Sequence, residues 1–312
     1  MNDIKNLKIL VIGDIILDEY IEGTVTRISP EAPIPILDKK QSYYRLGGAS
    51  NVAKNVASLG PYVMQLGRIG LDSHGEFVHN ELIKSNIDVM GVLCDNTVPT
   101  IVKTRFVCDN HQILRVDYED KKSIENTELG ESVREYLEWE LEKYDAVIIS
   151  DYQKGMIYPA LAQRIGEISR EKGVIAVVDT HKTNLGIFQN FTCITPNKKE
   201  LETAVSAKLS SLQEIKEAGE FLRNQLKLQY LLVTLSENGM LIITAKESIH
   251  IPVEPVNVVD VTGCGDTAIA VFTSALAAGY DAIEATKLAN KAAGIVVGKM
   301  GTASITSEDL FK

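Results

Sequence analysis

The residues best suited to chemistry lie in one short segment, DVTGCGD at residues 260–266, directly before the helix-forming run 267–278. Gly263 and Gly265 allow backbone N–H groups to turn toward one point, and a helix that begins there adds the positive end of its dipole. Asp266, at the edge of this anion cradle, is a good proton acceptor. The segment therefore suits transfer of a phosphoryl group to a hydroxyl. A glycine-rich turn with an ordinary aspartate N-cap accounts for the same residues equally well.

Two other nucleotide-binding patterns can be excluded directly. Residues 294–300 read GIVVGKM, which has one residue too few between the glycines and a Met where a P-loop needs Ser or Thr. The first predicted strand, 8–13, is followed by no G-x-G-x-x-G, so a dinucleotide-binding start is also disfavoured. A hydride-transfer enzyme is therefore not expected.

Candidate sugar ligands gather in two segments near the N-terminus. Asp14 and Asp18 follow the carboxyl end of the first predicted strand, where open α/β sheets place their ligands. Gly47, Gly48 and Asn51 open a helix-like run further along. Carboxylates and an amide can pair with sugar hydroxyls, and glycines let the backbone approach closely, so these residues suit a polyhydroxyl ligand.

A second helix start carries a polar pair. Asn197 and Glu200 lie one turn apart in TPNKKE, residues 195–200, and could share a face toward the waters bound to Mg²⁺. The same spacing forms a capping box, so both interpretations stand.

The chain reads as an α/β protein. Nearly continuous apolar strands suit a parallel sheet covered on both faces, and the amphipathic stretches between them are long enough for crossover helices. Alternating segments interrupt this rhythm at about 15–44 and 98–118, and we expect them to meet as a small β-sheet lid inserted into a single domain, 1–312. The strands are expected at 8–13, 146–150, 174–179 and 231–235, and the helices at 131–144, 159–172 and 211–226.

Composition limits the partners. The 32 Lys and Arg residues face 42 Asp and Glu residues, a net charge of -10, which disfavours broad binding to nucleic acid or to an anionic membrane. The N-terminus has no signal-peptide pattern, and no apolar run reaches the ~20 residues of a membrane span. The four cysteines show neither zinc-site nor disulfide-framework spacing. We therefore expect a cytoplasmic protein.

Together these segments resemble the ribokinase-like carbohydrate kinases, or PfkB family. The resemblance runs from KILVIGD at the start through LGGASNVAKNVASLG (46–60) and TPNKKE (195–200) to DVTGCGD (260–266). It implies an αβα sandwich with a mostly parallel central sheet and a β-sheet lid. It also implies ATP, Mg²⁺ and, as a further option, a monovalent cation such as K⁺.

The same resemblance assigns roles to residues. It implies that Asp266 is the base, that Gly263, Cys264 and Gly265 form the anion hole, and that Glu200 organises Mg²⁺ through water. The residues that it places at the nucleotide are Asn197, Glu200, Thr234, Ser236, Gly239, Gly263, Gly265 and Asn290. Cys264 stands where the family usually has Ala, which backbone N–H groups tolerate.

Within this family the chain is most similar to the D-glycero-β-D-manno-heptose 7-phosphate kinases, through TRISPEAPIP (26–35), ILRVDYE (113–119), SDYQKG (150–155) and VVGKMGT (296–302). These kinases phosphorylate the C1 hydroxyl to the 1,7-bisphosphate on the route to ADP-heptose and lipopolysaccharide. Where bifunctional members continue into a nucleotidyltransferase, this chain stops, so a stand-alone kinase is expected. A related acceptor (fructose, a fructose phosphate, ribose or a nucleoside) is the alternative, followed by a sensor without catalytic activity.

The substrate's phosphate needs cations. The family's Asp-Pro-Lys becomes Asp-Thr-His-Lys here, so His181 and Lys182 are candidates, together with Arg27 and Arg105. We expect the substrate site to comprise Asp14, Asp18, Arg27, Gly47, Gly48, Asn51, Arg105, His181, Lys182 and Asp266. The unpaired strands of the lid would clasp those of a second copy, so a homodimer is expected.

Overall fold

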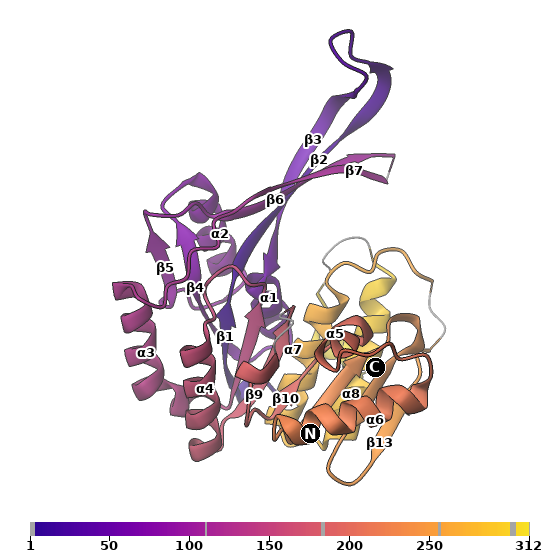
Figure 1. Ribbon diagram of the computed structural model, residues 1–312. Helices are drawn as coiled ribbons and strands as arrows, with labels where there is room; N and C mark the ends of the chain where they lie inside the picture. Colours follow the sequence, from indigo (N-terminus) through magenta and orange to yellow (C-terminus); the bar gives the residue numbers. More distant parts are fainter. Residues whose placement is uncertain (1–3, 110, 182–184, 255–256, 300–303, 312) are drawn as a thin grey trace.

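Apolar strands form the centre of the molecule, and helices cover both faces of the sheet that these strands build (Figure 1). In the first strand of the main sheet, Ile9 and Val11 belong to the core on one face, while Leu10 and Ile12 belong to the core on the other. The computed structural model describes residues 4–109, 111–181, 185–254, 257–299 and 304–311. The covered, mostly parallel sheet predicted from the strand and helix patterns and the αβα architecture implied by the resemblance are both confirmed.

Within the described residues, the main sheet has nine strands in the order β13-β12-β11-β10-β9-β8-β1-β4-β5. All neighbours from β11 to β5 are parallel, and β12 and β13 are antiparallel additions. The strands are β1 (Lys8–Gly13), β4 (Tyr62–Gly70), β5 (Val92–Asp95), β8 (Ala146–Asp151), β9 (Ile175–Thr180), β10 (Cys193–Ile194), β11 (Tyr230–Thr234), β12 (Met240–Ile243) and β13 (Ser248–Ile251).

The chain reverses its direction of travel across the sheet at β1, which pairs with β4 on one side and with β8 on the other. Ligands of open α/β sheets bind at the carboxyl ends of strands at such a switch point. Gly13 ends β1 here, and a Cβ on it would lie 1.9 Å from the carbonyl oxygen of Ser150, so only glycine lets the two strands approach this closely.

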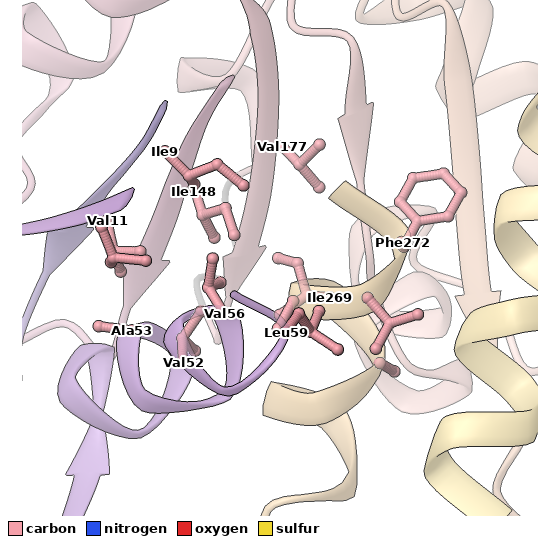
Figure 2. Packing of buried hydrophobic residues seen from close by; sticks show 14 of the residues in the cluster. Ile9, Val11, Val52, Ala53, Val56, Leu59, Ile148, Val177, Ile269 and Phe272 are labelled. Atoms are coloured by element: carbon pink, nitrogen blue, oxygen red, sulfur yellow. The ribbon is translucent and has the colours of Figure 1, made fainter. Parts of the chain in front are cut away.

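Helices cover both faces. Residues of α1, α2, α7 and α8 form one core with the sheet, and residues of α3, α4, α5 and α6 form the other. Figure 2 shows Val52 and Val56 of α1, and Ile269 and Phe272 of α7, packed beside strand residues. The helices are α1 (Ala49–Ser58), α2 (Ser73–Lys84), α3 (Glu128–Glu140), α4 (Pro159–Lys172), α5 (Lys198–Ala204), α6 (Leu212–Gln225), α7 (Cys264–Ala277), α8 (Ala282–Val297) and α9 (Ser307–Phe311), with 3-10 turns η1 (Ile4–Asn6), η2 (Leu141–Lys143), η3 (Leu185–Ile187) and η4 (Ser236–Asn238).

A second, four-stranded sheet projects from the main body (Figure 1). Its order is β3-β2-β6-β7, with β2 and β6 parallel and the other pairs antiparallel. The strands are β2 (Ile15–Ile28), β3 (Pro35–Gly48), β6 (Ile101–Cys108) and β7 (His111–Tyr118). We call this sheet the lid. None of the described helices is long and apolar enough to cross a membrane.

Helix α7 packs in the core and begins within the glycine-rich segment 260–266, so its packing is open to test. Replacing Phe272, which is fully buried, by Ala should lower the free energy of unfolding by about 3–5 kcal/mol, because a large cavity is left in the core. Phe221→Ala is the matched control, since Phe221 is 61% exposed. Urea denaturation followed by circular dichroism measures both, and equal losses for the two variants would contradict this packing.

Candidate active site

Functional side chains converge on the carboxyl edge of the main sheet. Tyr152 follows β8, His181 follows β9, Asn197 follows β10, and Thr234 ends β11. The carboxyl ends of parallel strands share one edge, so residues far apart in sequence meet there. The N-terminus of α7 faces the same place, because Gly263 and Asp266 line cavities together with these residues.

The predicted anion cradle is the first turn of α7. The helix begins at Cys264, three residues before the predicted start at 267, and its N-cap Gly263 has φ 79°, a left-handed conformation that favours glycine. The N–H groups of Gly265 and Asp266 lie in the first turn, where a helix supplies no acceptor. The Cys264 N–H donates to the carbonyl of Val261 at 3.3 Å, so this member of the predicted anion hole is engaged in a turn.

Asp266 is a buried carboxylate, 8% exposed. The Asn51 Nδ2 donates to its Oδ2 at 2.5 Å, and the Tyr152 hydroxyl approaches its Oδ1 at 3.4 Å. Burial raises the pKa of Asp266 to about 6, while these hydrogen bonds limit the rise. A carboxylate with a pKa near neutrality is suited to act as a general base.

A buried polar chain supports Asn51. Asn55 Nδ2 donates to the Asn51 carbonyl at 2.9 Å, and the Thr267 hydroxyl donates to the Asn55 Oδ1 at 3.0 Å. Helices α1 and α7 are therefore joined by side-chain hydrogen bonds as well as by apolar packing. This arrangement holds the donor of Asn51 against Asp266.

Three cavities meet at the start of α7. A central cavity of about 180 Å³ shares Gly263 and Asp266 with a cavity of about 300 Å³ under the lid. It shares Gly265 and Thr234 with a cavity of about 800 Å³ beside α8. We call these the central, acceptor and nucleotide cavities, after the ligands that the sequence resemblance implies. A group passing from the nucleotide cavity to the acceptor cavity would cross the first turn of α7 beside the base.

The nucleotide cavity collects five of the eight residues that the resemblance places at the nucleotide, whereas Asn197, Glu200 and Gly263 line the central cavity. Thr234, Ser236, Gly239 and Asn290 all line it. Gly239 has φ 85°, and a Cβ on it would lie 2.1 Å from the Ile251 carbonyl oxygen. Asn290 Nδ2 donates to the carbonyl of Pro252 at 2.8 Å, so this amide also secures the cavity wall.

Cys264 also lines the nucleotide cavity. Burial raises the pKa of its thiol to about 11, so the thiol stays protonated and is a weak nucleophile. The Cys264 side chain therefore contributes to this cavity as part of the wall and not as a reactive group.

The capping box that the sequence allowed is formed at α5. Asn197 Oδ1 accepts from the Glu200 N–H at 2.9 Å, and Glu200 Oε2 accepts from the Asn197 N–H at 2.8 Å. The other carboxylate oxygen of Glu200 lies 2.7 Å from His181 Nδ1, and this hydrogen bond raises the pKa of the imidazole. Both carboxylate oxygens of Glu200 therefore have hydrogen-bond partners, and its contact to Mg²⁺ through water stays a prediction.

The capping box is thus confirmed, and Glu200 and Asn197 also line the central cavity, where their role toward Mg²⁺ stays a prediction. Among the residues that the structure describes, no group of three or more His, Cys, Asp or Glu side chains could itself hold a metal ion. A hard cation that prefers oxygen ligands and retains waters fits this donor set, with phosphate oxygens as its other ligands.

The acceptor cavity holds Asp18, Gly47, Gly48 and Asn51, as the sequence predicted. A Cβ on Gly47 would lie 2.5 Å from Asp18 Oδ2, so glycine leaves room for this carboxylate. Asp18 Oδ1 pairs with the Arg105 guanidinium at 2.6 Å. Oxygen acceptors and a cation thus line the same cavity.

Sequence reasoning missed two further cations in this cavity, Lys103 and Arg115. Arg115 lies directly across from Arg105 in the β6–β7 pair. Lys103 Nζ is 3.3 Å from Asp117, whose carboxylate also pairs with Arg115 at 2.8 Å. Side chains alternate between the two faces of a strand, so residues 103 and 105 of β6 lie on the same face. This alternation was the signal that could have identified Lys103 from the predicted Arg105.

Tyr152 and Asp179 were also missed, although both line the central cavity. Burial, followed by the charge of Asp266, raises the pKa of Asp179 to about 7. The ring of Tyr152 lies edge-on to that of His181, 4.8 Å between centroids. Tyr152 directly follows β8, and Asp179 lies within β9. These positions near the carboxyl ends of parallel strands were the signal that could have identified both residues.

Several predicted substrate ligands lie elsewhere. Asp14 is buried, and its carboxylate accepts the backbone N–H groups of Tyr152, Lys154 and Met156 at 2.8–3.1 Å. Burial raises the pKa of Asp14 to about 6. It therefore supports a loop and does not line the acceptor cavity.

The predicted cations are likewise separated. The Arg27 side chain is 65% exposed near the tip of the lid, where it pairs with Asp38 at 3.8 Å. His181 lines the central cavity and not the acceptor cavity. Lys182 falls outside the described residues.

Known proteins resemble this chain over its length. The family described as pfkB family carbohydrate kinase matches residues 6–309. A bifunctional protein HldE from Geotalea uraniireducens is 37% identical over 98% of this chain, and one from Helicobacter pylori strain J99 is 39% identical over 97%. The chain spans 63% and 65% of the length of these two relatives.

Solved structures share the fold. A ribokinase from Arabidopsis thaliana, complexed with ribose and ATP, superposes with a TM-score of 0.81 at 20% identity, covering 98% of both chains. Phosphofructokinase-2 from Escherichia coli, in complex with potassium, gives 0.80 at 19% identity, covering 98% of this chain and 97% of that one.

The titration of Asp266 can be tested through Asn51. Replacing Asn51 by Leu removes the donor that stabilises the ionised carboxylate, so the pKa of Asp266 should rise above about 6. Because a base acts only when deprotonated, the acid limb of kcat/KM should move to higher pH. Ser274→Ala removes a hydrogen bond within α7 and serves as the control. If the acid limb of kcat/KM lies at the same pH in Asn51→Leu as in the wild type, the assignment of this limb to Asp266 is contradicted.

Proposed function

This chain belongs to the PfkB family of carbohydrate kinases, and from that premise we propose that it phosphorylates a sugar phosphate, D-glycero-β-D-manno-heptose 7-phosphate, at its C1 hydroxyl with ATP. One observation carries the proposal: the acceptor cavity is lined both by the buried carboxylate of Asp266 and by three cations, Lys103, Arg105 and Arg115. A neutral sugar needs the first feature, whereas only a phosphorylated one uses the second.

The reaction follows from the base and the helix start. Asp266 removes the proton of the acceptor hydroxyl as that oxygen attacks the γ-phosphorus of ATP, and the bond from phosphorus to the β–γ bridging oxygen breaks to release ADP. The N–H groups of Gly265 and Asp266, with the dipole of α7, face the oxygens that carry the developing charge. His181, whose pKa is raised by Glu200, adds positive charge to the central cavity in its protonated form.

Specificity is assigned to the lid. Lys103, Arg105 and Arg115 all line the acceptor cavity, and Arg105 and Arg115 lie directly opposite each other in the β6–β7 pair. Like charges directly opposite are unfavourable unless an anion lies between them. Asp18 and Asp117 provide this neutralisation in the free protein, and we infer that the substrate's phosphate joins them there.

The nucleotide is assigned to the cavity between η4, α7 and α8, which has the volume for a ligand of this size. Glu200 and Asn197 would orient the waters of Mg²⁺, which neutralises phosphate charge when bound. A monovalent cation such as K⁺ belongs to the proposal on the strength of the potassium-bound fold relative.

A homodimer through the lid is part of the same proposal. Strand β7 is an edge strand with exposed apolar side chains on one face: Leu114, Val116 and Tyr118 are 48–60% exposed. A long apolar edge of this kind favours pairing with another chain. A second copy of the lid has the complementary edge.

Acceptor specificity is tested by ADP release with Mg²⁺-ATP. The panel comprises the heptose 7-phosphate, fructose, fructose 6-phosphate, fructose 1-phosphate, ribose and adenosine. Turnover should be confined to the heptose phosphate, and Asp266→Asn should lower kcat by roughly 10²–10⁴-fold with the fold intact. Preferred turnover of an unphosphorylated sugar would discard the heptose assignment, and normal turnover by Asp266→Asn would discard the base.

The lid cations yield a separate prediction. Lys103→Met and Arg115→Met should each raise KM for the phosphorylated acceptor by roughly 10–100-fold, because a hydrogen bond to a charged group is lost. KM for ATP should stay the same. Lys39→Met, an exposed lysine on β3 of the same lid, is the matched control. If KM for the acceptor is unchanged in both cavity variants, the phosphate lies elsewhere.

A further inference from the structure

A buried ion pair joins the lid to the loop 152–156, which lies beside Asp266. Lys154 Nζ lies 2.6 Å from Glu119 Oε2, and the two side chains are only 11% and 14% exposed. Glu119 directly follows β7 of the lid, whereas Lys154 lies in the loop 152–156 after β8. The pair therefore connects two segments that are 35 residues apart in the chain.

The loop that carries Lys154 is also the loop that carries Tyr152. Its backbone is held by Asp14, whose carboxylate accepts the N–H groups of residues 152, 154 and 156. The Tyr152 hydroxyl lies 3.4 Å from Asp266 Oδ1. A shift of this loop therefore moves a hydrogen-bond donor of the base.

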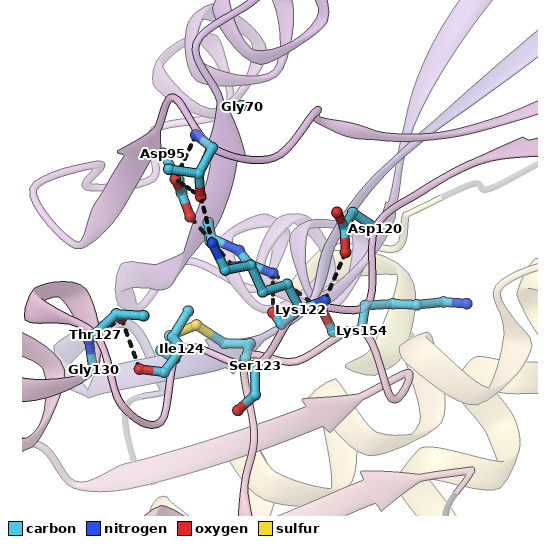
Figure 3. Close-up of polar contacts among 12 residues, drawn as sticks. Gly70, Asp95, Asp120, Lys122, Ser123, Ile124, Thr127, Gly130 and Lys154 are labelled. Carbon is cyan, nitrogen blue, oxygen red and sulfur yellow. Dashed lines mark hydrogen bonds and ion pairs between the residues drawn. The ribbon is translucent and has the colours of Figure 1, made fainter.

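Arg68 also connects the stretch 119–122 to the loop 152–156. Its guanidinium donates to the Lys122 carbonyl at 2.8 Å and to the Lys154 carbonyl at 3.2 Å, and it pairs with Asp95 at 3.4 Å. Figure 3 shows Lys122 and Lys154 side by side in this cluster. The stretch 119–122 and the loop 152–156 are thus held together by backbone and side-chain contacts.

From this arrangement we propose that Lys154 is a positioning residue. The ion pair between Lys154 and Glu119 fixes the loop 152–156 against the segment that follows β7 of the lid. It thereby holds the Tyr152 hydroxyl near Asp266. Lys154 lines none of the three cavities, so it acts through Tyr152 and not on the substrate.

Glu119 extends the connection to the acceptor cavity. Its Oε2 also lies 3.8 Å from Lys103 Nζ, one of the lid cations assigned to the substrate's phosphate. Lys103 of the acceptor cavity therefore shares the Glu119 carboxylate with Lys154, whose loop reaches Asp266. This part rests on the proposed function, whereas the link from Lys154 to Tyr152 does not.

The surroundings make the pair suitable for mutation. If Lys154 is replaced, Glu119 keeps Lys121 at 3.4 Å and Lys103 at 3.8 Å, so no isolated buried charge is left behind. Lys121 provides a matched control because it pairs with the same carboxylate but is 65% exposed. Lys121→Met removes one positive charge near Glu119 without touching the loop.

The kinetic test uses whichever acceptor the wild-type protein phosphorylates. Lys154→Met should lower kcat by roughly 10–100-fold, since small displacements at a reacting centre have effects of this size. KM for the acceptor and for ATP should change by less than about threefold. Lys154→Arg should restore most of kcat, and Lys121→Met should match the wild type. Wild-type kcat in Lys154→Met, or a rise in KM alone, overturns the proposal.

A second measurement is independent of turnover and of the proposed substrate. Hydrogen–deuterium exchange of the full chain, read by mass spectrometry over residues 150–158, reports the amides bound by Asp14. Exchange should be faster in Lys154→Met and in Glu119→Gln than in the wild type or in Lys121→Met, with exchange in the core strands unchanged. Unaltered exchange in both variants overturns the proposal even if no acceptor is found, and global acceleration in both, without a local excess, assigns the pair to stability and overturns it as well.

Discussion

The buried carboxylate of Asp266 is the constraint on which the rest of the site depends. An ionised carboxylate away from water is costly unless donors surround it. Asn51 from α1 and Tyr152 from the loop after β8 supply such donors, and the N-terminus of α7 adds the positive end of its dipole. These contacts limit how far α1, α7 and β8 can move relative to one another. The same constraint leaves the pKa of Asp266 at about 6, within the range useful to a base.

The lid combines two surfaces in one thin sheet because side chains alternate along each strand. Toward the acceptor cavity it presents Lys103, Arg105 and Arg115. Asp18 and Asp117 neutralise these cations in the free protein, so the cavity can hold several positive charges without strong mutual repulsion. At its edge β7 presents apolar side chains, so the element proposed to recognise phosphate is also the one proposed to recognise a second copy.

Much of the architecture could be predicted from local patterns. The strand at 8–13 and the helix at 159–172 have the predicted bounds, because apolar runs and turn residues mark these ends. The family and its αβα fold were evident from four separated motifs and are confirmed. The start of α7 was misplaced by three residues, because glycines normally interrupt helices, whereas Gly263 serves as the N-cap and Gly265 lies in the first turn.

Errors in the site arose where a residue's partner is distant in sequence. Asp14 follows a central strand, as ligand-binding aspartates do, yet its oxygens are taken by the loop after β8. Arg27 carries the expected charge but lies near the tip of the lid, where its side chain is mostly exposed and pairs with Asp38. Lys103 and Arg115 look like solvated charges until the pairing register of β6 and β7 places them over one cavity.

The sequence by itself determined the strand and helix periods, the glycine-rich start of α7 and the chemical type of each site residue, because these depend on neighbours within one turn or one strand. The tertiary structure decided which carboxylate lies where the proposed base must act and which is a structural acceptor, and which cations line a cavity. Burial and long-range hydrogen bonds set those roles: Asp14 and Asp266 have the same side chain and similarly raised pKa values, but only Asp266 lies where the cavities meet.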